Sequence, residues 1–277
     1  MRGAFGFMRA LGPSLGPRLG AWVARTFGPL TGAHRVAAEN IAAAFPDASP
    51  ERRAEIAREA WDNLGRTACE YVHMDAIWAG RVEADAATEA RFAALRADPV
   101  PTLVFAAHLA NWELPAVAAA REGLRAAVLY RTPNSRAVAA EILRLRQDQM
   151  GELVPAGLFA PARLAKALQG GATVGMLVDQ RFGRGPRVTF LGREATANPL
   201  LATLARRFDC PVRGARAVRL PGGERFRLEL TDPLDLPRDA EGKVDVAAAT
   251  GVINDVVAGW IAEQPGQWLW MHRRWRM

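Results

Sequence analysis

A histidine and a glutamate close together in the sequence are the two side chains best placed to carry out chemistry. His108 follows an apolar run at residues 102–107, and Glu113 follows His108 after four intervening residues. A histidine can accept a proton near neutral pH, and a carboxylate beside it can fix its tautomer and stabilise the imidazolium. The spacing also fits a plainer interpretation, in which His108 is a buried histidine with one hydrogen bond and Glu113 favours a positive helix end.

Helix geometry restricts where such a pair can meet. On one continuous helix, two residues five positions apart point about 140° away from each other. His108 and Glu113 can therefore meet only if the helix begins after His108. Pro115 favours such a start, because proline fits only the first turn of a helix. The sequence thus predicts His108 in a strand-to-helix turn, at the carboxyl end of a buried strand where open α/β sheets bind their ligands.

No activated nucleophile accompanies this pair in the sequence. The chain has no Gly-x-Ser-x-Gly motif, and its two cysteines, Cys69 and Cys210, lie far from His108 along the chain. A covalent enzyme intermediate is therefore disfavoured. The sequence favours direct transfer, in which His108 takes the proton of a hydroxyl that attacks an activated acyl group. Because the histidines and cysteines are scattered, we expect no metal site.

The elements that must position these residues change character along the chain. Residues 31–98 form a predicted helical subregion and residues 99–277 a predicted α/β core, within a single domain that follows a segment at 1–30. Predicted strands lie at 102–107, 125–130, 152–155, 173–178, 187–191, 212–219 and 225–230. Strands that alternate with helices predict an α/β fold with a mixed, mainly parallel sheet flanked by helices on both faces, with an N-terminal helical extension. Pro221-Gly222-Gly223 predicts a hairpin between the last two strands.

The net charge of +7 comes almost wholly from arginine, since Lys166 and Lys243 are the only lysines. A basic surface suits partners that carry phosphate or carboxylate groups, such as nucleic acid, an anionic membrane or an acidic carrier protein. The arginines are spread along the chain without a recognised nucleic-acid-binding motif, so we expect no nucleic-acid partner.

Residues 1–30 combine apolar side chains with interrupting arginines, among them Arg9 and Arg18. The apolar runs fall short of the roughly 18 to 20 residues that a membrane-spanning helix needs, and they also fit a signal peptide poorly. The pattern fits two alternatives equally: a segment that lies in the membrane interface, or a helical flap on the protein's own core. We take 1–30 as a membrane-interface segment in the predicted organisation.

Several blocks of the chain resemble a known protein family. Residues 108–113 read His-Leu-Ala-Asn-Trp-Glu, which resembles the His-x4-Asp/Glu signature of glycerolipid acyltransferases as the late acyltransferases of lipid A biosynthesis carry it (the lauroyl/myristoyl transferase family). Further blocks follow in the family's order: Tyr130-Arg131-Thr132-Pro133-Asn134, Leu177-Val178-Asp179-Gln180, Cys210-Pro211-Val212, and the tail at 264–275 with its Gln-Trp-Leu-Trp-Met-His-Arg-Arg run. The resemblance covers nearly the whole chain.

The resemblance implies a glycerolipid acyltransferase fold and an O-acyltransferase activity. It implies transfer of a fatty acyl chain from acyl carrier protein to a hydroxyl of a lipid A precursor, without a covalent intermediate, a metal or a cofactor beyond acyl-ACP or acyl-CoA as co-substrate. His108 would be the base and Glu113 the group that orients it. The residues implied to bind substrate are Asn111, Arg131, Asp179, Gln180, Arg273 and Arg274.

The resemblance also implies partners and a location. The expected partners are acyl carrier protein, a glycolipid acceptor and the inner-membrane surface. The expected location is the cytoplasmic face of the bacterial inner membrane, with peripheral or shallow attachment. In the tail, Trp268, Trp270 and Trp275 fit either the membrane interface or a last strand with one packed face.

Two departures from the family's pattern bear on the acceptor. Gly266 stands where the family usually has glutamate, and Arg181 stands where an acidic residue is frequent. Both are compatible with another acceptor, such as a lysophospholipid, an ornithine-type lipid or a different glycolipid. An alternative of a different class is a non-catalytic membrane-binding protein, against which the complete pair of His108 and Glu113 argues.

Overall fold

The computed structural model describes residues 2–131, 136–147 and 149–275, and its centre is a seven-stranded sheet. The strands of this sheet are β1 (Val82–Ala84), β2 (Thr102–Ala106), β3 (Ala126–Tyr130), β4 (Glu152–Pro155), β5 (Thr173–Leu177), β8 (Val212–Arg219) and β9 (Phe226–Leu230). Their order across the sheet is β1-β9-β8-β2-β5-β3-β4, and only the β8–β9 pair is antiparallel. The predicted α/β fold with a mixed, mainly parallel sheet is confirmed.

β2 and β5 are neighbouring central strands, and their apolar sequences suit a position covered on both faces. Their register pairs Ala106 with Leu177 at the carboxyl end of each strand. The chain therefore leaves both strands at the same level of one sheet edge. We call this edge, where β2, β3, β4 and β5 all end, the carboxyl edge.

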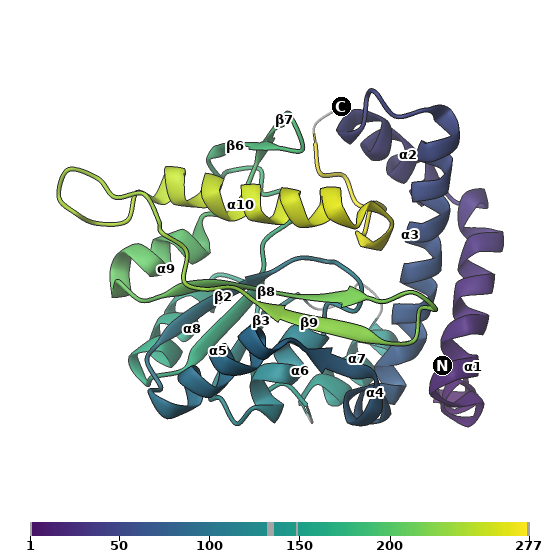
Figure 1. Ribbon diagram of the computed structural model, residues 1–277, viewed down its shortest axis with the longest axis horizontal. Helices are drawn as coiled ribbons and strands as arrows, with labels where there is room; N and C mark the ends of the chain where they lie inside the picture. Colours follow the sequence, from purple (N-terminus) through teal and green to yellow (C-terminus); the bar gives the residue numbers. More distant parts are fainter. Residues whose placement is uncertain (1, 132–135, 148, 276–277) are drawn as a thin grey trace.

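Helices cover both faces of the sheet (Figure 1). One face carries α5 (Ala86–Ala97) and α6 (Leu114–Arg121), which Figure 1 shows below the sheet. The other face packs against α8 (Ala160–Gln169), α9 (Leu200–Phe208) and α10 (Val246–Glu263), and this side holds the main hydrophobic core. There the Phe105 ring stacks on Trp260 with ring centroids 5.6 Å apart. The remaining elements of this part are α4 (Met74–Arg81), α7 (Arg136–Gln147) and a separate ribbon of β6 (Arg187–Phe190) and β7 (Arg193–Thr196).

The N-terminal part is helical, as predicted, with α1 (Arg2–Phe27), α2 (Gly32–Ala44) and α3 (Pro50–Glu70). α1 lies alongside α3 (Figure 1), and the two backbones approach closely at Gly20 and Gly65. A Cβ atom on either glycine would clash with the carbonyl oxygen of the other. One face of α1 is therefore a flap on the protein's own core.

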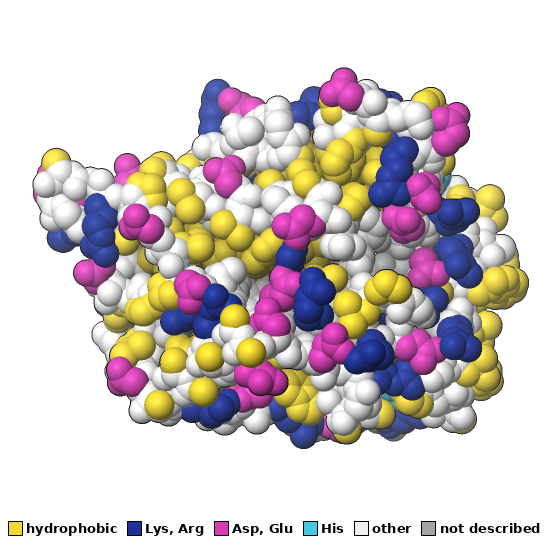
Figure 2. Space-filling model, viewed as in Figure 1, with side chains coloured by type: hydrophobic (Ala, Val, Ile, Leu, Met, Phe, Trp, Pro, Cys, Tyr) yellow, Lys and Arg dark blue, Asp and Glu magenta, His cyan; other side chains and the backbone are white. Residues whose placement is uncertain are grey.

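The opposite face of α1 leaves apolar side chains uncovered. Phe7, Trp22 and Phe27 are all more than half exposed. Figure 2 shows hydrophobic side chains along this outer edge, at the right of the view, with arginines beside them. The membrane-interface segment predicted for residues 1–30 thus stays a prediction that this second face fits.

The helix start predicted at Pro115 is confirmed, since Pro115 lies in the first turn of α6. α3 begins at a cap of the usual kind, in which the Ser49 side chain accepts a hydrogen bond from the Arg52 backbone N–H at 3.2 Å. Two short strands were not predicted, β1 and β7. The stretch predicted as a strand at 187–191 forms β6, which pairs in the ribbon and not in the main sheet.

Among the described residues, α10 is the one helix long and apolar enough to cross a membrane. Its Ile253, Val257 and Ile261 are nevertheless buried in the main core. A core helix of a folded domain passes the same length and hydropathy criteria.

Candidate active site

His108 lies at the carboxyl edge of the sheet, side by side with Asp179. Each residue follows the last paired position of its strand by two, so the parallel register brings them together. His108 Nδ1 lies 2.9 Å from Asp179 Oδ1, and the His108 backbone N–H donates to Oδ2 at 3.1 Å. The Trp268 indole N–H donates to the same Oδ2 at 2.7 Å. Asp179 thus accepts three hydrogen bonds, two of them from His108.

The Asp179 carboxylate is fully buried, yet it stays ionised. Burial alone would raise its pKa, but the charge and hydrogen bond of His108, the nearby His272 and the hydrogen bond of Trp268 together hold the pKa well below its usual range. An ionised carboxylate at this position accepts a hydrogen bond from Nδ1–H of His108. The proton of the neutral imidazole is therefore on Nδ1, and the Nε2 lone pair is free. With Nε2 free in this tautomer, the imidazole has the chemistry that a general base requires.

The carboxylate beside His108 is therefore Asp179, and the predicted contact with Glu113 is wrong. Glu113 is the residue immediately before α6, so the turn at residues 109–112 separates it from His108. The hydrogen bonds that the structure gives to the Glu113 side chain come from Arg146 and Tyr71. The predicted strand-to-helix turn is confirmed, while the pairing of residues within it is different.

Glu113, which is buried, and the half-buried Arg146 and Tyr71 form a second polar group. The Arg146 guanidinium binds both Glu113 carboxylate oxygens, with an Nε–Oε2 distance of 2.8 Å. The Tyr71 hydroxyl donates to Oε1, and burial together with the Glu113 charge raises the pKa of Tyr71 above its usual range. A bidentate pair of this kind holds the arginine in one orientation.

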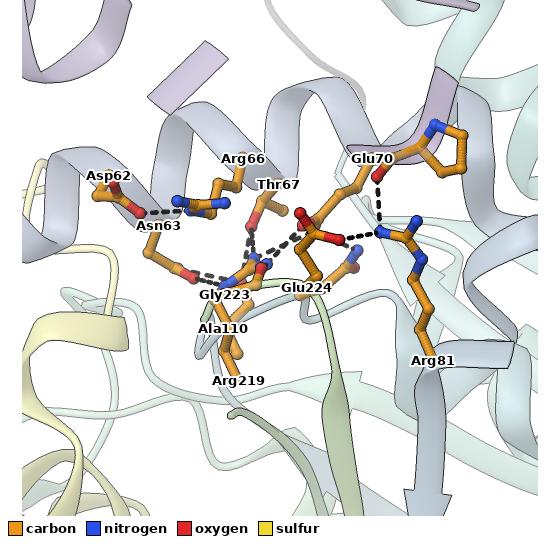
Figure 3. A network of polar contacts seen from close by, with 12 residues as sticks. Asp62, Asn63, Arg66, Thr67, Glu70, Arg81, Ala110, Arg219, Gly223 and Glu224 are labelled. Atoms are coloured by element: carbon orange, nitrogen blue, oxygen red, sulfur yellow. Dashed lines mark hydrogen bonds and ion pairs between the residues drawn. The ribbon is translucent and has the colours of Figure 1, made fainter. Parts of the chain in front are cut away.

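The turn between His108 and Glu113 is fixed by α3 (Figure 3). Ala110 has a φ of 47°, in the left-handed region that residues with a Cβ atom rarely adopt. Its carbonyl accepts hydrogen bonds from Asn63 Nδ2 at 3.1 Å and from Thr67 Oγ1 at 2.9 Å. These two donors hold the strained residue two positions after His108.

Arg219, at the end of β8, completes this network (Figure 3). Its guanidinium donates to both carboxylate oxygens of Glu70 on α3. It also donates to Asn63 Oδ1 at 2.8 Å and to Thr67 Oγ1 at 3.1 Å. Arg219 and Glu70 are both buried, so this ion pair fixes α3 against the sheet.

Asn111 also belongs to this network and does not face a substrate site. Its side chain is 1 % exposed, donates to Glu70 Oε2 at 3.0 Å and accepts from the Glu113 backbone N–H at 3.2 Å. The position of Asn111 does not fit the predicted binding of substrate. Its hydrogen bonds instead stabilise the turn between His108 and Glu113.

The two arginines of the tail differ in their surroundings. Arg274 is fully buried, donates to the Thr196 carbonyl and to Asn254, and stacks over the Phe190 ring. Burial lowers the pKa of Arg274 to about 10 despite the nearby Asp179. Its position does not fit the predicted role in binding substrate phosphate. Arg273 is exposed and lies 3.8 Å from Glu39, so its predicted role stays open.

The tail tryptophans are core residues. Trp268 and Trp270 are fully buried with their rings in edge contact, and Trp275 is 2 % exposed. Of the two predicted alternatives, the packed one is correct and the membrane interface is wrong. Trp268 pairs with Leu109 in a single antiparallel bridge instead of a full strand.

A largely apolar cavity of about 620 Å³ starts at His108 and runs along the sheet face covered by α5 and α6. The sheet side of the cavity is formed mainly by alternate strand residues: Val104, Ala106, Ala126, Val128, Thr173, Gly175, Leu177 and Ala215. Residues of α5 and α6 line the opposite side. Gly175 widens the middle of the cavity, because a Cβ atom at this position would project into open space, with Val128 as its nearest neighbour at 4.0 Å. From Thr173 to Leu177 the cavity spans four strand steps, about 13 Å at the usual rise per residue.

Polar side chains line the mouth of this cavity at the carboxyl edge. They include His108, Glu113, Arg131, Arg146, Gln180 and Arg181. Two predicted binding residues, Arg131 and Gln180, thus lie at the mouth together with His108. The remainder of the block after Arg131, residues 132–134, lies outside the described residues.

Three residues that contribute to this site were not predicted from the sequence: Tyr71, Arg146 and Arg219. No motif marks them, because each reaches the site from a distant part of the chain. The partnership of His108 with Asp179 did leave a signal. Both residues directly follow predicted apolar strands, and they would meet once those strands were known to be neighbours.

Comparison with known families identifies the chain as a whole. A family model described as bacterial lipid A biosynthesis acyltransferase matches residues 3–277. No curated protein matches the chain. The family match extends from the first turn of α1 through the sheet and its carboxyl edge to the buried tail, and it includes both His108 and Asp179. The chain therefore belongs to the family of bacterial lipid A biosynthesis acyltransferases.

Proposed function

We propose that this protein transfers a fatty acyl chain from the thioester of acyl carrier protein to a hydroxyl of a lipid A precursor. The observation that carries the proposal is the His108–Asp179 pair at the mouth of a long apolar cavity. Family membership supports the lipid A precursor as acceptor. The donor and the residue roles rest on the chemistry of the site.

In this proposal His108 is the general base. Its Nε2 takes the proton of the acceptor hydroxyl as the hydroxyl oxygen attacks the thioester carbonyl. The carbon–sulfur bond then breaks, and the imidazolium returns the proton to the leaving thiolate. Asp179 holds the ring in the required tautomer and balances the charge of the imidazolium. No covalent acyl-enzyme forms in this scheme.

The cavity would hold the acyl chain. About 13 Å of apolar wall between Leu177 and Thr173 corresponds to about ten methylene groups of an extended chain. Burial of a methylene group is worth about 0.8 kcal/mol, so a chain of this length supplies most of the binding energy of the donor.

Charged groups at the mouth suit the rest of the reaction. The guanidinium of Arg146 lines the cavity, and its N–H groups would donate hydrogen bonds to the oxyanion formed during attack, while Glu113 fixes its orientation and offsets its net charge. Arg131 and Arg181, also at the mouth, suit a phosphate of the acceptor. Acyl carrier protein is acidic, which suits the net charge of +7.

Mass spectrometry of membrane lipids tests this function. A strain that lacks the protein should accumulate lipid A without one secondary acyl chain, and the wild-type gene should restore it. His108→Ala should fail to restore the chain. His34→Ala, a control histidine on α2 that accepts a hydrogen bond from Trp61, should restore it. Unaltered lipid A beside another underacylated lipid would identify a different acceptor and overturn the proposal.

A further inference from the structure

Two adjacent bulky apolar side chains project from the loop that follows β4. Leu158 is 88 % exposed and Phe159 is 75 % exposed, whereas the next residue, Ala160, is buried in the first turn of α8. Exposure of two neighbouring side chains of this size costs hydration free energy that a folded protein usually avoids. A surface of this kind is typical of a binding site.

The position of this loop places it close to a group of arginines. β4, β3 and β5 are consecutive neighbours in the sheet and all end at the carboxyl edge. Arg131 directly follows β3, and Arg181 and Arg184 follow β5. With neighbouring strands about 4.8 Å apart, the ends of β5 and β4 are about 10 Å apart.

These three arginines are exposed, and within the described ranges 2–131, 136–147 and 149–275 no ion pair involves them. Other exposed arginines nearby are paired, as Arg163 is with Glu152 at 3.4 Å. The carboxyl edge thus combines a protruding apolar loop with positive charge that has no acidic partner in this part of the chain. This combination is complementary to an anionic lipid surface.

The mouth of the cavity opens on the same edge. Its lining there includes Arg131, Ala156 and the 40 % exposed Phe182. Ala156 precedes the protruding loop by two residues and bonds to the Tyr130 carbonyl at the end of β3. The apolar loop and the arginines therefore border the entrance that leads to His108.

We propose that this part of the carboxyl edge docks on an anionic bilayer, with Leu158 and Phe159 below the headgroups and the three arginines at the lipid phosphates. A bilayer accepts any projecting apolar side chain, whereas a protein partner would need a pocket shaped to receive each of them. In this orientation the cavity mouth faces the membrane. A lipid acceptor then reaches His108 without leaving the bilayer.

An environment-sensitive fluorophore at position 159 tests the docking directly. The probe is attached to Phe159→Cys in a Cys210→Ser background, since the remaining Cys69 is buried. The matched control is Val100→Cys, at an exposed apolar position just before the amino end of β2. Vesicles of phosphatidylglycerol and phosphatidylethanolamine should increase the fluorescence of the probe at position 159 several-fold. The fluorescence of the probe at position 100 should not change.

A binding measurement complements the probe. The double variant Leu158→Ser/Phe159→Ser should bind these vesicles at least about tenfold more weakly. Each of Arg131→Gln, Arg181→Gln and Arg184→Gln should weaken binding about fivefold at low salt. If the protein cosediments with the vesicles but the fluorescence of the probe at position 159 does not increase, the proposal is wrong. Brightening by acyl carrier protein instead of vesicles would show a protein-docking surface, and equal binding to neutral vesicles would refute the role of the arginines.

Discussion

Replacement of Asp179 by asparagine tests how the base is held, because it keeps the size and shape of the side chain while it removes the negative charge and changes the hydrogen-bonding pattern. Asp179 accepts from the His108 backbone and from Trp268 at Oδ2, and from His108 Nδ1 at Oδ1. An asparagine has one acceptor oxygen. If that oxygen keeps the two donors now at Oδ2, the amide N–H group faces His108 Nδ1, which must then give up its proton. The proton moves to Nε2, and His108 can no longer accept one from a hydroxyl.

The expected loss follows from the same substitution in serine-protease triads, where an amide in place of the carboxylate lowers kcat by about 10⁴-fold through the wrong histidine tautomer. For Asp179→Asn we expect a fall of about 10³- to 10⁴-fold in kcat, which corresponds to about 4 to 5.5 kcal/mol of activation free energy. The KM values should change little, because the cavity wall is untouched.

Steady-state acyl transfer by the purified variant gives kcat, and ¹⁵N NMR of the imidazole gives the tautomer. The matched control is Glu113→Gln, which weakens the pairing with Arg146 and leaves the His108–Asp179 contact in place. The histidine tautomer should change in Asp179→Asn and not in the control. Near wild-type kcat in Asp179→Asn, with the proton still on Nδ1, would show that Asp179 does not set the tautomer of His108.

Three further outcomes follow from other parts of the structure. Arg219→Met leaves the buried Glu70 carboxylate without its partner, so urea denaturation should show a loss of about 3 to 5 kcal/mol, and adding Glu70→Leu should recover part of it. Gly175→Val narrows the cavity beside Val128, so competition between acyl donors should shift toward shorter chains by about fourfold for each excluded methylene group. Burial lowers the pKa of His272 below its value in the unfolded chain, so the stability that this residue contributes is present above about pH 6.5 and is lost as the pH falls further. The denaturation midpoint of His272→Gln should therefore fall less than that of the wild type between about pH 7 and pH 5.

Local features of the fold were predictable from the sequence because they depend on nearby residues. Ser49 followed by Pro50 marks the start of α3, and Pro115 marks the start of α6. Apolar runs bounded by turns located the main strands to within one or two residues. The short strand β1 was missed, because its three residues pair only with β9, far along the chain.

The partner of His108 was not predictable in the same way. Spacing drew attention to Glu113, the nearest carboxylate in sequence. The contact with Asp179 depends on which strands are neighbours, and 71 positions separate the two residues. The buried ion pair of Arg219 and Glu70 was not predictable for the same reason. The two residues become partners only when β8 packs against α3.

In the proposed mechanism His108, held by Asp179, is the general base for acyl transfer to a lipid A precursor. The most direct measurement is the rate at which purified His108→Ala transfers an acyl chain from acyl carrier protein to that precursor, compared with wild type. We expect a rate at least about 10³-fold below wild type, with an unchanged circular dichroism spectrum. A folded His108→Ala protein that transfers acyl chains at a rate close to wild type would contradict this mechanism.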